Sequence, residues 1–527
     1  MRKLFTLILI GLGLNLSLNA QSTFWTATSY KGAFPVTDGT PATNWTYGWS
    51  NFDPENTNYP STTSTLNSDI TTNTTIGGNV LLQNKIYVTN GATLTILPGT
   101  IIRGDKATQA TLIVTKGCKI IAEGTQNLPI VFTSNESIGN RAEGDWGGLV
   151  ILGKAVNNQP GGVANIEGIV PTANTQYGGS DDNDNSGSLK YVRIEFAGIA
   201  LEPNKEINGI TFGSVGRGTQ VDFIQVSFSG DDSYEWFGGT VDCKHLIAYR
   251  GIDDDFDTDF GYRGRIQFGL IIRDNTMYDA AGDSNGLESD NDAAGSANTP
   301  QTAAIFSNLT IIGAKGNGSL SLPVGEKFEK AFRIRRNSSI SVFNSLVVGW
   351  EKGLSIEGAS CETNVTSGTL VFSNNVLTEL PLGASYVTAA STFFTTVASV
   401  NDTTTSVSQI NWINAFPTLG TTPDCRLDST SLVATGADFT NSKFVGGFVS
   451  VNEIAKTTNV SIYPNPATNN VNITTDRLVQ VTLIDGMGRV INTQTVSGNL
   501  SLDVSTLTNG IYFLQVDNTT KKIIVRK

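Results

Sequence analysis

Short apolar runs, each closed by Gly, Asp or Asn, repeat through the middle of the chain. From about Ile76 to Leu377 they hold four to eight mostly β-branched or aromatic residues, as in LKYVRIEFAG, VDFIQVSFSG and RIQFGLIIRD. No stretch has the sustained periodicity of an amphipathic helix. The pattern therefore predicts an all-β protein of short strands separated by turns.

The spacing of these runs indicates how the strands are arranged. Tyr191, Asp222, Lys244 and Arg265 mark strong strands and follow one another at intervals of 31, 22 and 21 residues. One turn of a parallel β-helix takes roughly 20 to 25 residues, and longer intervals contain loops that leave the coil. Two β-sandwiches are the competing fold, but they would show strands every ~8 to 12 residues with hairpin turns throughout. We predict a right-handed parallel β-helix, a solenoid, over residues 68–377.

Alternate residues of each strand should point into this coil and stack on equivalent residues of the next turn, about 4.8 Å away. The core is then a column rather than a ball. The apolar ladders are expected to contain Val192, Ile194 and Phe196 in one turn, and Ile224, Val226 and Phe228 in the next.

The first residues have the features of a secretory signal peptide. Arg2 and Lys3 precede an apolar run from Leu4 to Leu18, and the small residue Ala20 is followed by polar residues. The run is shorter than the ~20 apolar residues that a membrane-spanning helix needs. We predict that residues 1–20 are a signal peptide removed on export, and that the mature protein has no transmembrane segment.

The last residues predict a separate small β-sandwich over residues 460–527. VSIYPNPATNNVNI, VTLIDGMGRVI and NGIYFLQV are short strands broken by turn formers, and a basic tail follows. In this order the three motifs resemble the type A C-terminal sorting domain of Bacteroidetes proteins that leave through the type IX secretion system. The resemblance implies recognition by the outer-membrane translocon, removal by a surface sortase, and attachment to the cell surface or release. The residues expected to carry the sorting signal are Gly510, Tyr512, Lys521, Lys522 and Lys527.

The middle of the chain resembles an uncharacterised family of secreted Bacteroidetes proteins of the β-helix type. The shared sequences include GATLTILPGTIIRGDK, GDWGGLVILGKA and VSFSGDDSYEWFGGTVDCKHLIAYRGIDDDFDTDFGY, and they lie between Leu81 and Gly313. This resemblance implies export and brings no activity with it.

Two segments flank the predicted coil. Residues 21–67 are rich in Trp, Tyr, Thr and Pro, and we expect them to cap the open N-terminal end, whose unpaired strand edge would otherwise recruit other strands. Residues 378–459 are rich in Thr and Ser, with few charges. We expect them to finish the solenoid and then to link it to the sorting domain.

Charge and cysteine content narrow the partners. The chain has 35 basic and 47 acidic residues, a formal net charge of −12. An acidic surface argues against nucleic acid as a partner and suits divalent cations or neutral glycans, although solubility alone also explains it. Four cysteines are too few for a disulfide scaffold and lack the spacing of a zinc site. Cys118 and Cys243 fall within strand patterns, whereas Cys361 and Cys425 are candidates for one disulfide in an oxidising location.

Acidic residues gather where strands end. Asp181, Asp182 and Asp184 form one group, and Asp231 and Asp232 with Glu235 form the next. Hard carboxylate oxygens in such number suit calcium, and turn carbonyls can complete its ligand shell. Alternatively, these are solvated turn aspartates that bond to their own backbone. The candidate calcium ligands are Asp231, Asp232, Asp253, Asp254, Asp255, Asp257, Asp259, Glu288, Asp290 and Asp292.

Arginines and aromatic residues are interleaved with these acids. Arg250, Tyr249, Trp236 and Arg263 are candidates for binding a glycan or another cell-surface ligand. The only histidine, His245, lies within a strand pattern and is expected to be structural. We find no motif of a hydrolase nucleophile, a zinc protease or a phosphate-binding loop. The sequence therefore favours an exported solenoid acting in adhesion, glycan binding or matrix building and stiffened by calcium. The alternative is a polysaccharide lyase or glycoside hydrolase acting along the acidic face.

Overall fold

The computed structural model describes residues 24–202, 205–280, 282–323, 328, 330–380, 386–387, 400–417, 420–444, 461–485, 489–516 and 519–527. The predicted signal peptide, residues 1–20, lies outside the described residues. The chain divides into two compact units, Thr23–Val445 and a unit that contains Gly446–Lys527. Each is described by itself.

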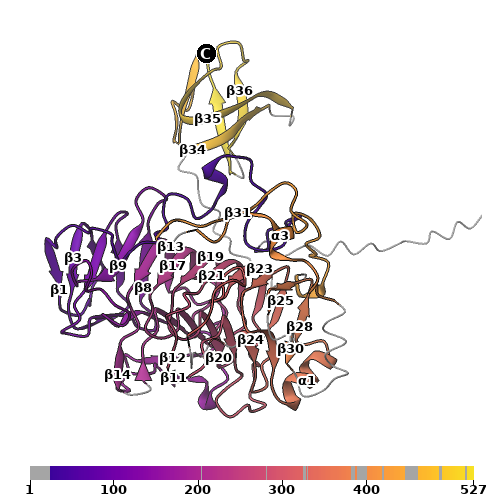
Figure 1. Ribbon diagram of the computed structural model, residues 1–527. Coiled ribbons are helices and arrows are strands. Elements are labelled where there is room, and N and C mark those ends of the chain that lie inside the picture. The colour runs from indigo at the N-terminus through magenta and orange to yellow at the C-terminus, as the bar shows by residue number, and fades with distance from the viewer. Residues whose placement is uncertain are drawn as a thin grey trace, which may run out of the picture. The chain divides into compact units, whose positions relative to one another are not determined.

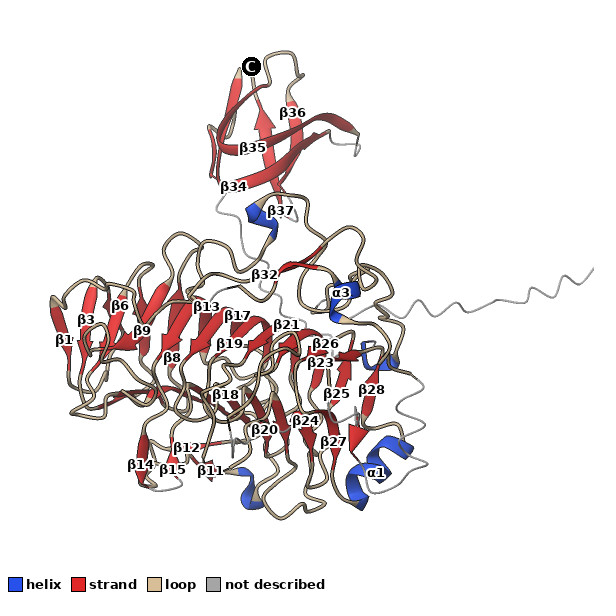
Figure 2. Cartoon of the chain, in the orientation of Figure 1, coloured by secondary structure: helices blue, strands red, loops and turns tan. Residues whose placement is uncertain are grey.

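The larger unit is a coil of parallel strands, shown in Figures 1 and 2. Two sheets form its walls, and nearly all of their neighbouring strands are parallel and come from successive turns. The alternation of buried and less buried residues along β3 to β6 shows why these sequences form strands, since every second side chain enters the coil. The prediction of a parallel β-helix is confirmed.

Sixteen strands of the described chain form the first sheet, here called the long-strand sheet. Its central members are longer because they run across two walls of the coil. The strands are β1 (Ser64–Leu66), β2 (Thr74–Ile76), β3 (Asn79–Leu82), β5 (Thr93–Ile96), β6 (Ile101–Gly104), β8 (Lys119–Glu123), β9 (Ile130–Ser134), β13 (Gly187–Glu195), β17 (Gln220–Ser227), β19 (Asp242–Tyr249), β21 (Arg265–Ile272), β23 (Ile305–Ile312), β25 (Ser341–Phe343), β26 (Leu346–Val348), β28 (Val371–Ser373) and β29 (Val376–Thr378).

Ten described strands form the second sheet, here called the short-strand sheet, which closes the coil. They are β4 (Lys85–Val88), β7 (Thr111–Val114), β10 (Gly148–Leu152), β16 (Ile210–Gly213), β18 (Tyr234–Phe237), β20 (Phe256–Asp259), β22 (Leu287–Ser289), β24 (Lys330–Ile334), β27 (Lys352–Ile356) and β30 (Tyr386–Val387).

Smaller elements lie in loops between these strands or in the segments before β1 and after β30. They are the pairs β11 (Ala164–Asn165) with β12 (Gln176–Tyr177), β14 (Ala200–Glu202) with β15 (Lys205–Glu206), and β31 (Trp412–Asn414) with β32 (Asp424–Leu427), the helices α1 (Ala359–Thr366) and α3 (Val407–Ile410), and the 3-10 turns η1 (Pro41–Thr43), η2 (Pro160–Gly162) and η3 (Ser442–Phe444).

The register agrees with the sequence spacing to within two residues. Asp222 of β17 pairs with Lys244 of β19, as the 22-residue interval predicts. Asp222 pairs with Lys190 on its other side, one position from the marker Tyr191, and Lys244 pairs with Gln267, two positions from the marker Arg265. Val192 and Ile194 pair with Ile224 and Val226 and are buried in the column, as expected.

Phe196 and Phe228 do not join that column, contrary to the sequence expectation. Both take positive φ angles, 63° and 56°, directly after their strands. This conformation reverses the alternation, so that both rings stack on the outside of the coil, with centroids 5.1 Å apart.

Each long strand bends at one residue of positive φ, and these residues form a continuous stack. Tyr191, Phe223, His245 and Phe268 have φ between 50° and 64°, and their ring centroids are 4.5, 4.3 and 5.0 Å apart in succession. The following turns place Asn308, Asn344 and Asn374 at the same position. We call this row the bend stack. It accounts for His245, which also bonds Asp222 at 2.8 Å, as a structural residue.

The N-terminal segment, residues 24–59, runs along the flank of the coil instead of capping its end. Gly32 donates to Asn344 O at 2.7 Å, Asn51 to Gln225 Oε1 at 2.8 Å, and the Tyr59 hydroxyl to Glu195 at 2.8 Å. The segment therefore crosses several turns in reverse order before β1 begins the coil. Its apolar residues cover the outward rings of the long-strand sheet, which a cap over the end would leave exposed.

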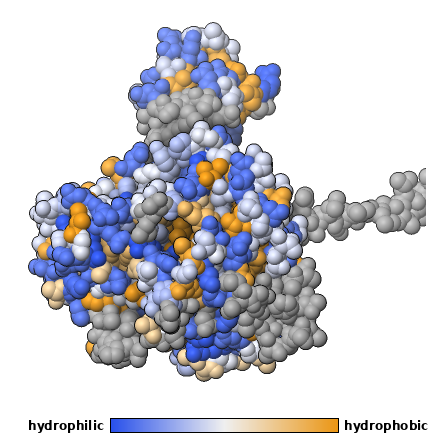
Figure 3. All heavy atoms as spheres, in the orientation of Figure 1, coloured by the Kyte–Doolittle hydropathy of each residue, from blue (hydrophilic) through white to orange (hydrophobic). Residues whose placement is uncertain are grey.

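Residues 400–444 cover the same flank farther along the coil. Val36 of the N-terminal segment forms a parallel bridge with Leu427, and Phe444 packs with Trp25 and Phe343. The described part of the region predicted as solenoid end and linker thus packs against the coil. In the space-filling view, apolar residues on the visible face are scattered among polar ones rather than gathered in one broad patch (Figure 3).

The C-terminal unit is an antiparallel β domain with its own apolar core. Its described strands form one sheet: β33 (Ser461–Tyr463), β34 (Asn470–Ile484), β35 (Val490–Asp503), β36 (Gly510–Val516) and β37 (Thr519–Val525). The predicted order of a parallel solenoid followed by a small β domain is confirmed.

Candidate functional site: a buried carboxylate cluster

A row of charged side chains crosses the outer face of the short-strand sheet. Tyr234 and Trp236 of β18 point into the coil and are fully buried, so Glu235 between them points outward. The register pairs Glu235 with Asp257, Asp257 with Glu288, and Glu288 with Arg333. Four successive turns therefore present three acids and then an arginine, about 4.8 Å apart.

The turns that precede these strands bring further acids to the same place. Asp231, Asp232 and Asp253 can each offer one oxygen such that the three lie within 4.8 Å of one another, and so can Asp232, Glu235 and Asp257. The two groups share Asp232. We call the five residues the carboxylate cluster; Asp232 and Glu235 have only 7% and 8% of their surface exposed.

A ladder of turn residues holds the cluster in place. Asn208, Asp232, Asp254 and Asn285 each stand two residues before a short strand, in successive turns. Asp232 Oδ1 accepts a hydrogen bond from Asp254 N at 2.9 Å, and Asp254 Oδ1 accepts one from Asn285 N at 2.6 Å. Asn208 donates to Glu235. Asn208 escaped the sequence analysis because it is not acidic; its equivalence to Asp232 one turn later is the signal that would have identified it.

The cluster is electrostatically unfavourable as it stands. Burial, and then the neighbouring carboxylates, raise the pKa values of Asp232, Asp253 and Asp257 well above the usual range, and burial does the same for Glu235. Asp257 Oδ1 is buried and has no hydrogen-bond partner within the described chain. Like charges this close are costly unless protons or a cation lie among them.

The other candidate calcium ligands already have partners in the protein. Asp255 pairs with Arg273 at 2.7 Å, with both side chains fully buried. Asp290 pairs with Arg335 and Arg336 at 2.9 and 2.6 Å.

Three more of the candidate calcium ligands also have partners in the protein, through ion pairs or backbone hydrogen bonds. Glu288 contacts Arg333 at 3.3 Å and also Arg335. Asp292 and Asp259 accept backbone hydrogen bonds, from Ala294 and Ser296 and from Phe260. Of the predicted ligands, the structure thus brings Asp231, Asp232, Asp253 and Asp257 together and adds Glu235.

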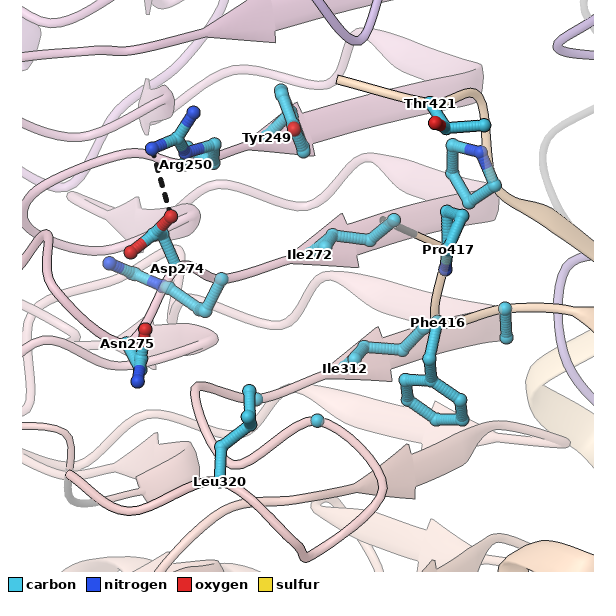
Figure 4. Close-up of a pocket in the computed structure, with 15 residues that line it drawn as sticks. Tyr249, Arg250, Ile272, Asp274, Asn275, Ile312, Leu320, Phe416, Pro417 and Thr421 are labelled. Carbon is cyan, nitrogen blue, oxygen red and sulfur yellow. Dashed lines mark ion pairs between the residues drawn. The ribbon is translucent and has the colours of Figure 1, made fainter. Parts of the chain in front are cut away.

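The candidate ligand-binding residues are dispersed. Trp236 is fully buried inside the coil, and Arg263 pairs with Asp182 at 3.1 Å. Tyr249 and Arg250 line a pocket on the flank, together with Asp274, which bonds Arg250 at 2.8 Å (Figure 4). Of the four predicted ligand-binding residues, only Tyr249 and Arg250 therefore remain candidates for contacting a ligand.

The predicted disulfide is wrong for this structure. Cys361 lies in α1 and packs into the main column, whereas Cys425 lies in β32 and packs into the flank cluster with Phe34 and Trp49. All four cysteines are buried free thiols. Burial raises the pKa of Cys361 to about 11, which favours the neutral thiol.

The predicted sorting residues have distinct environments in the C-terminal unit. Gly510 begins β36, and Tyr512 is buried with its hydroxyl donating to Thr508 O at 2.9 Å. Lys521 and Lys522 of β37 are exposed, and the Lys527 amide donates to Asn509 Oδ1 at 2.7 Å. Their part in sorting stays a prediction.

Comparison with known proteins places both units. No curated protein matches the chain significantly. Residues 461–527 match the secretion system C-terminal sorting domain, which marks the protein for type IX secretion, with attachment to the cell surface or release. Among the described helices, none has the length and apolar character to cross a membrane. Residues 65–416 match the pectate-lyase like beta helix domain, and the chain therefore belongs to that family.

Proposed function

We propose that this secreted β-helix acts outside the cell in adhesion, glycan binding or matrix building, and that its carboxylate cluster binds calcium. The observation that carries the calcium proposal is the pair of carboxylate groups that share the buried Asp232. Calcium takes six to eight oxygen ligands, which carboxylates and turn carbonyls supply. The cluster offers five carboxylates around the shared, buried Asp232.

A bound cation would connect successive turns of the coil. Asp231, Asp232 and Glu235 belong to one turn, and Asp253 and Asp257 belong to the next. A divalent ion among them would replace repulsion between turns with attraction. Because it would bind the folded chain alone, it would stabilise the fold by about 2.7 kcal/mol at a free concentration of 100 times Kd.

The geometry gives less support to the enzymatic alternative. A lyase of this kind would need an arginine or lysine free to take up a proton, whereas the arginines beside these acids are ion-paired, Arg273 with Asp255 and Arg335 with Asp290. An inverting hydrolase needs two carboxyl groups ~6.5 to 9.5 Å apart, whereas the oxygens within each group of the cluster lie within 4.8 Å. Burial of Asp232 and Glu235 also favours a structural role.

Calcium titration of the secreted protein tests the proposal. The protein, freed of metal with a chelator, should release or absorb heat on titration with calcium and should melt at a higher temperature. Asp257→Asn should weaken both effects at least tenfold in calcium concentration. Asp181→Asn, an exposed turn acid outside the cluster, is the matched control and should leave both unchanged. Absence of both heat and a melting shift in the unmodified protein would refute calcium binding.

A further inference from the structure

The flank of the coil contains a pocket of about 280 Å³, on a different wall from the carboxylate cluster. Its floor is a row of three register partners, Tyr249, Ile272 and Ile312, at the ends of β19, β21 and β23. Phe416 and Pro417 of the segment 400–444 form the facing wall (Figure 4). Chain segments more than a hundred residues apart thus enclose a largely apolar space, and we call it the flank pocket.

One end of the flank pocket is polar. Arg250 bonds Asp274 at 2.8 Å, and it bonds Glu55 of the N-terminal segment at the same distance. Asn275 is half-buried beside this pair; its Nδ2 donates to Ser321 O at 3.1 Å, and its Oδ1 can accept a hydrogen bond. The Arg250 Nε–H is buried and has no hydrogen-bond partner in the described part of the chain. Donors and acceptors therefore meet at one end of an apolar trough.

The charges at this end select among ligands. Arg250 faces two carboxylates, which gives the three groups a net charge of −1. Arg273, which also lines the pocket, is neutralised by Asp255, and Lys315 nearby pairs with Glu351. An anionic ligand would thus meet repulsion. A purely apolar ligand would take water from charged groups without replacing its hydrogen bonds, which is costly.

We propose that the flank pocket binds a neutral saccharide of one or two rings, with a ring face on Tyr249, Ile272 and Phe416 and hydroxyl groups at Arg250, Asp274 and Asn275. A sugar ring combines an apolar face with hydroxyls that both donate and accept, as the two parts of the pocket require. This assignment gives the glycan-binding part of the proposed function a location. It is independent of calcium binding.

Ligand-observed NMR on the full secreted protein, with a panel of disaccharides, tests the assignment. The panel contains neutral disaccharides of glucose, galactose and mannose, digalacturonate as the anionic member, and an alkyl alcohol as the apolar member. At least one neutral disaccharide should bind, more tightly than digalacturonate and the alcohol. Phe416→Ala and Asn275→Ala should each weaken that binding at least fivefold, whereas Leu128→Ala, at an exposed apolar residue of an early turn, should not change it.

Other results would overturn the assignment. Binding of digalacturonate in preference to the neutral sugars, binding of the alcohol alone, or failure of every neutral sugar to bind at millimolar concentration would each refute it. A Phe416→Ala protein that melts normally and binds the sugar unchanged would move the site elsewhere. Repeating the measurement with chelator at pH 5 separates the two proposals, because loss of calcium binding should leave saccharide binding intact.

Discussion

The two faces of the coil that carry candidate sites differ in the side chains that point outward and in what covers them. On the long-strand flank, outward rings such as Phe228 and Tyr249 are covered by the chain's own segments, 24–59 and 400–444. On the short-strand face, three consecutive acids precede Arg333 in the outward row, and Glu235 is buried among neighbouring carboxylates. The same stacking that makes apolar ladders stable makes acidic ladders unstable. The rings of the flank are therefore covered by the protein itself, whereas the carboxylates of the acidic face repel one another unless protons or a cation lie among them.

The largest expected difference between the two faces is their response to pH. Burial raises the pKa of Asp254 and of Glu288 to about 8, from 3.8 and 4.5 in the absence of structure. Between about pH 4 and pH 8 the folded chain thus binds more protons than the unfolded chain, so its free energy of unfolding must fall as pH rises. Each pKa unit corresponds to about 1.4 kcal/mol.

Melting temperatures measured with chelator from pH 5 to pH 8 should therefore fall, and calcium should restore stability chiefly at the upper end. A melting temperature that rises over this range with chelator present would mean that other groups outweigh the acidic face.

The second-largest effect is expected from removing a buried ring that holds the N-terminal segment on the flank. Trp49 is 1% exposed and lies edge-on against Tyr191 and Phe223 of the bend stack. Replacing a buried tryptophan with alanine costs about 3 to 5 kcal/mol, so Trp49→Ala should lower the midpoint of urea unfolding and expose the N-terminal segment to proteases. Tyr47→Ala, at a side chain that is half exposed, serves as the control. Equal effects of both substitutions would show that this segment is not held by its buried rings.

The effect of a single substitution in the acidic face on stability should change sign when calcium is added. Burial raises the pKa of Asp257 well above its usual range, so Asp257→Asn, which removes this ionisable group, should raise the stability of the metal-free protein at pH 8. In saturating calcium the same change removes a ligand and should lower stability. Thermal melts of both forms, with and without calcium, measure this difference. A substitution that destabilises the protein equally in both conditions would indicate a purely structural aspartate.

The smallest effect is expected at a paired charge outside both faces. Arg263 and Asp182 form a partly exposed ion pair at 3.1 Å. Exposed pairs contribute about 0 to 1 kcal/mol, so Arg263→Met should leave the melting temperature nearly unchanged and calcium binding unaffected. A loss of calcium affinity in this variant would extend the site to the upstream acids Asp181 to Asp184.

The sequence predicted those features that depend on local repetition. Spacing located the turns of the coil, and alternation identified Val192 and Ile224 as core residues. It misplaced Phe228, because a single positive φ angle of 56° reverses the alternation and leaves no mark in the apolar pattern.

The sequence alone could not show where the N-terminal segment packs or which residues pair with the acids. Asp290 meets Arg335 across 45 residues, and Val36 meets Leu427 across 391 residues. Such pairings depend on which turns become neighbours, and periodicity does not report that.

Because the covering segments contact the bend stack turn by turn, their lengths must match the number of turns in the coil. Its aromatic members lie under the N-terminal segment, where Trp49 contacts Tyr191 and Trp45 contacts His245. Asn308 also binds the N-terminal segment, through Tyr30 O at 3.2 Å. The last two asparagines bind the segment 400–444, since Asn344 and Asn374 donate to the carbonyls of Asp438 and Gly436 at 3.0 and 2.7 Å. Deleting one turn would displace every later contact by about 4.8 Å. The solenoid can therefore gain or lose a turn only if both of these segments change length with it.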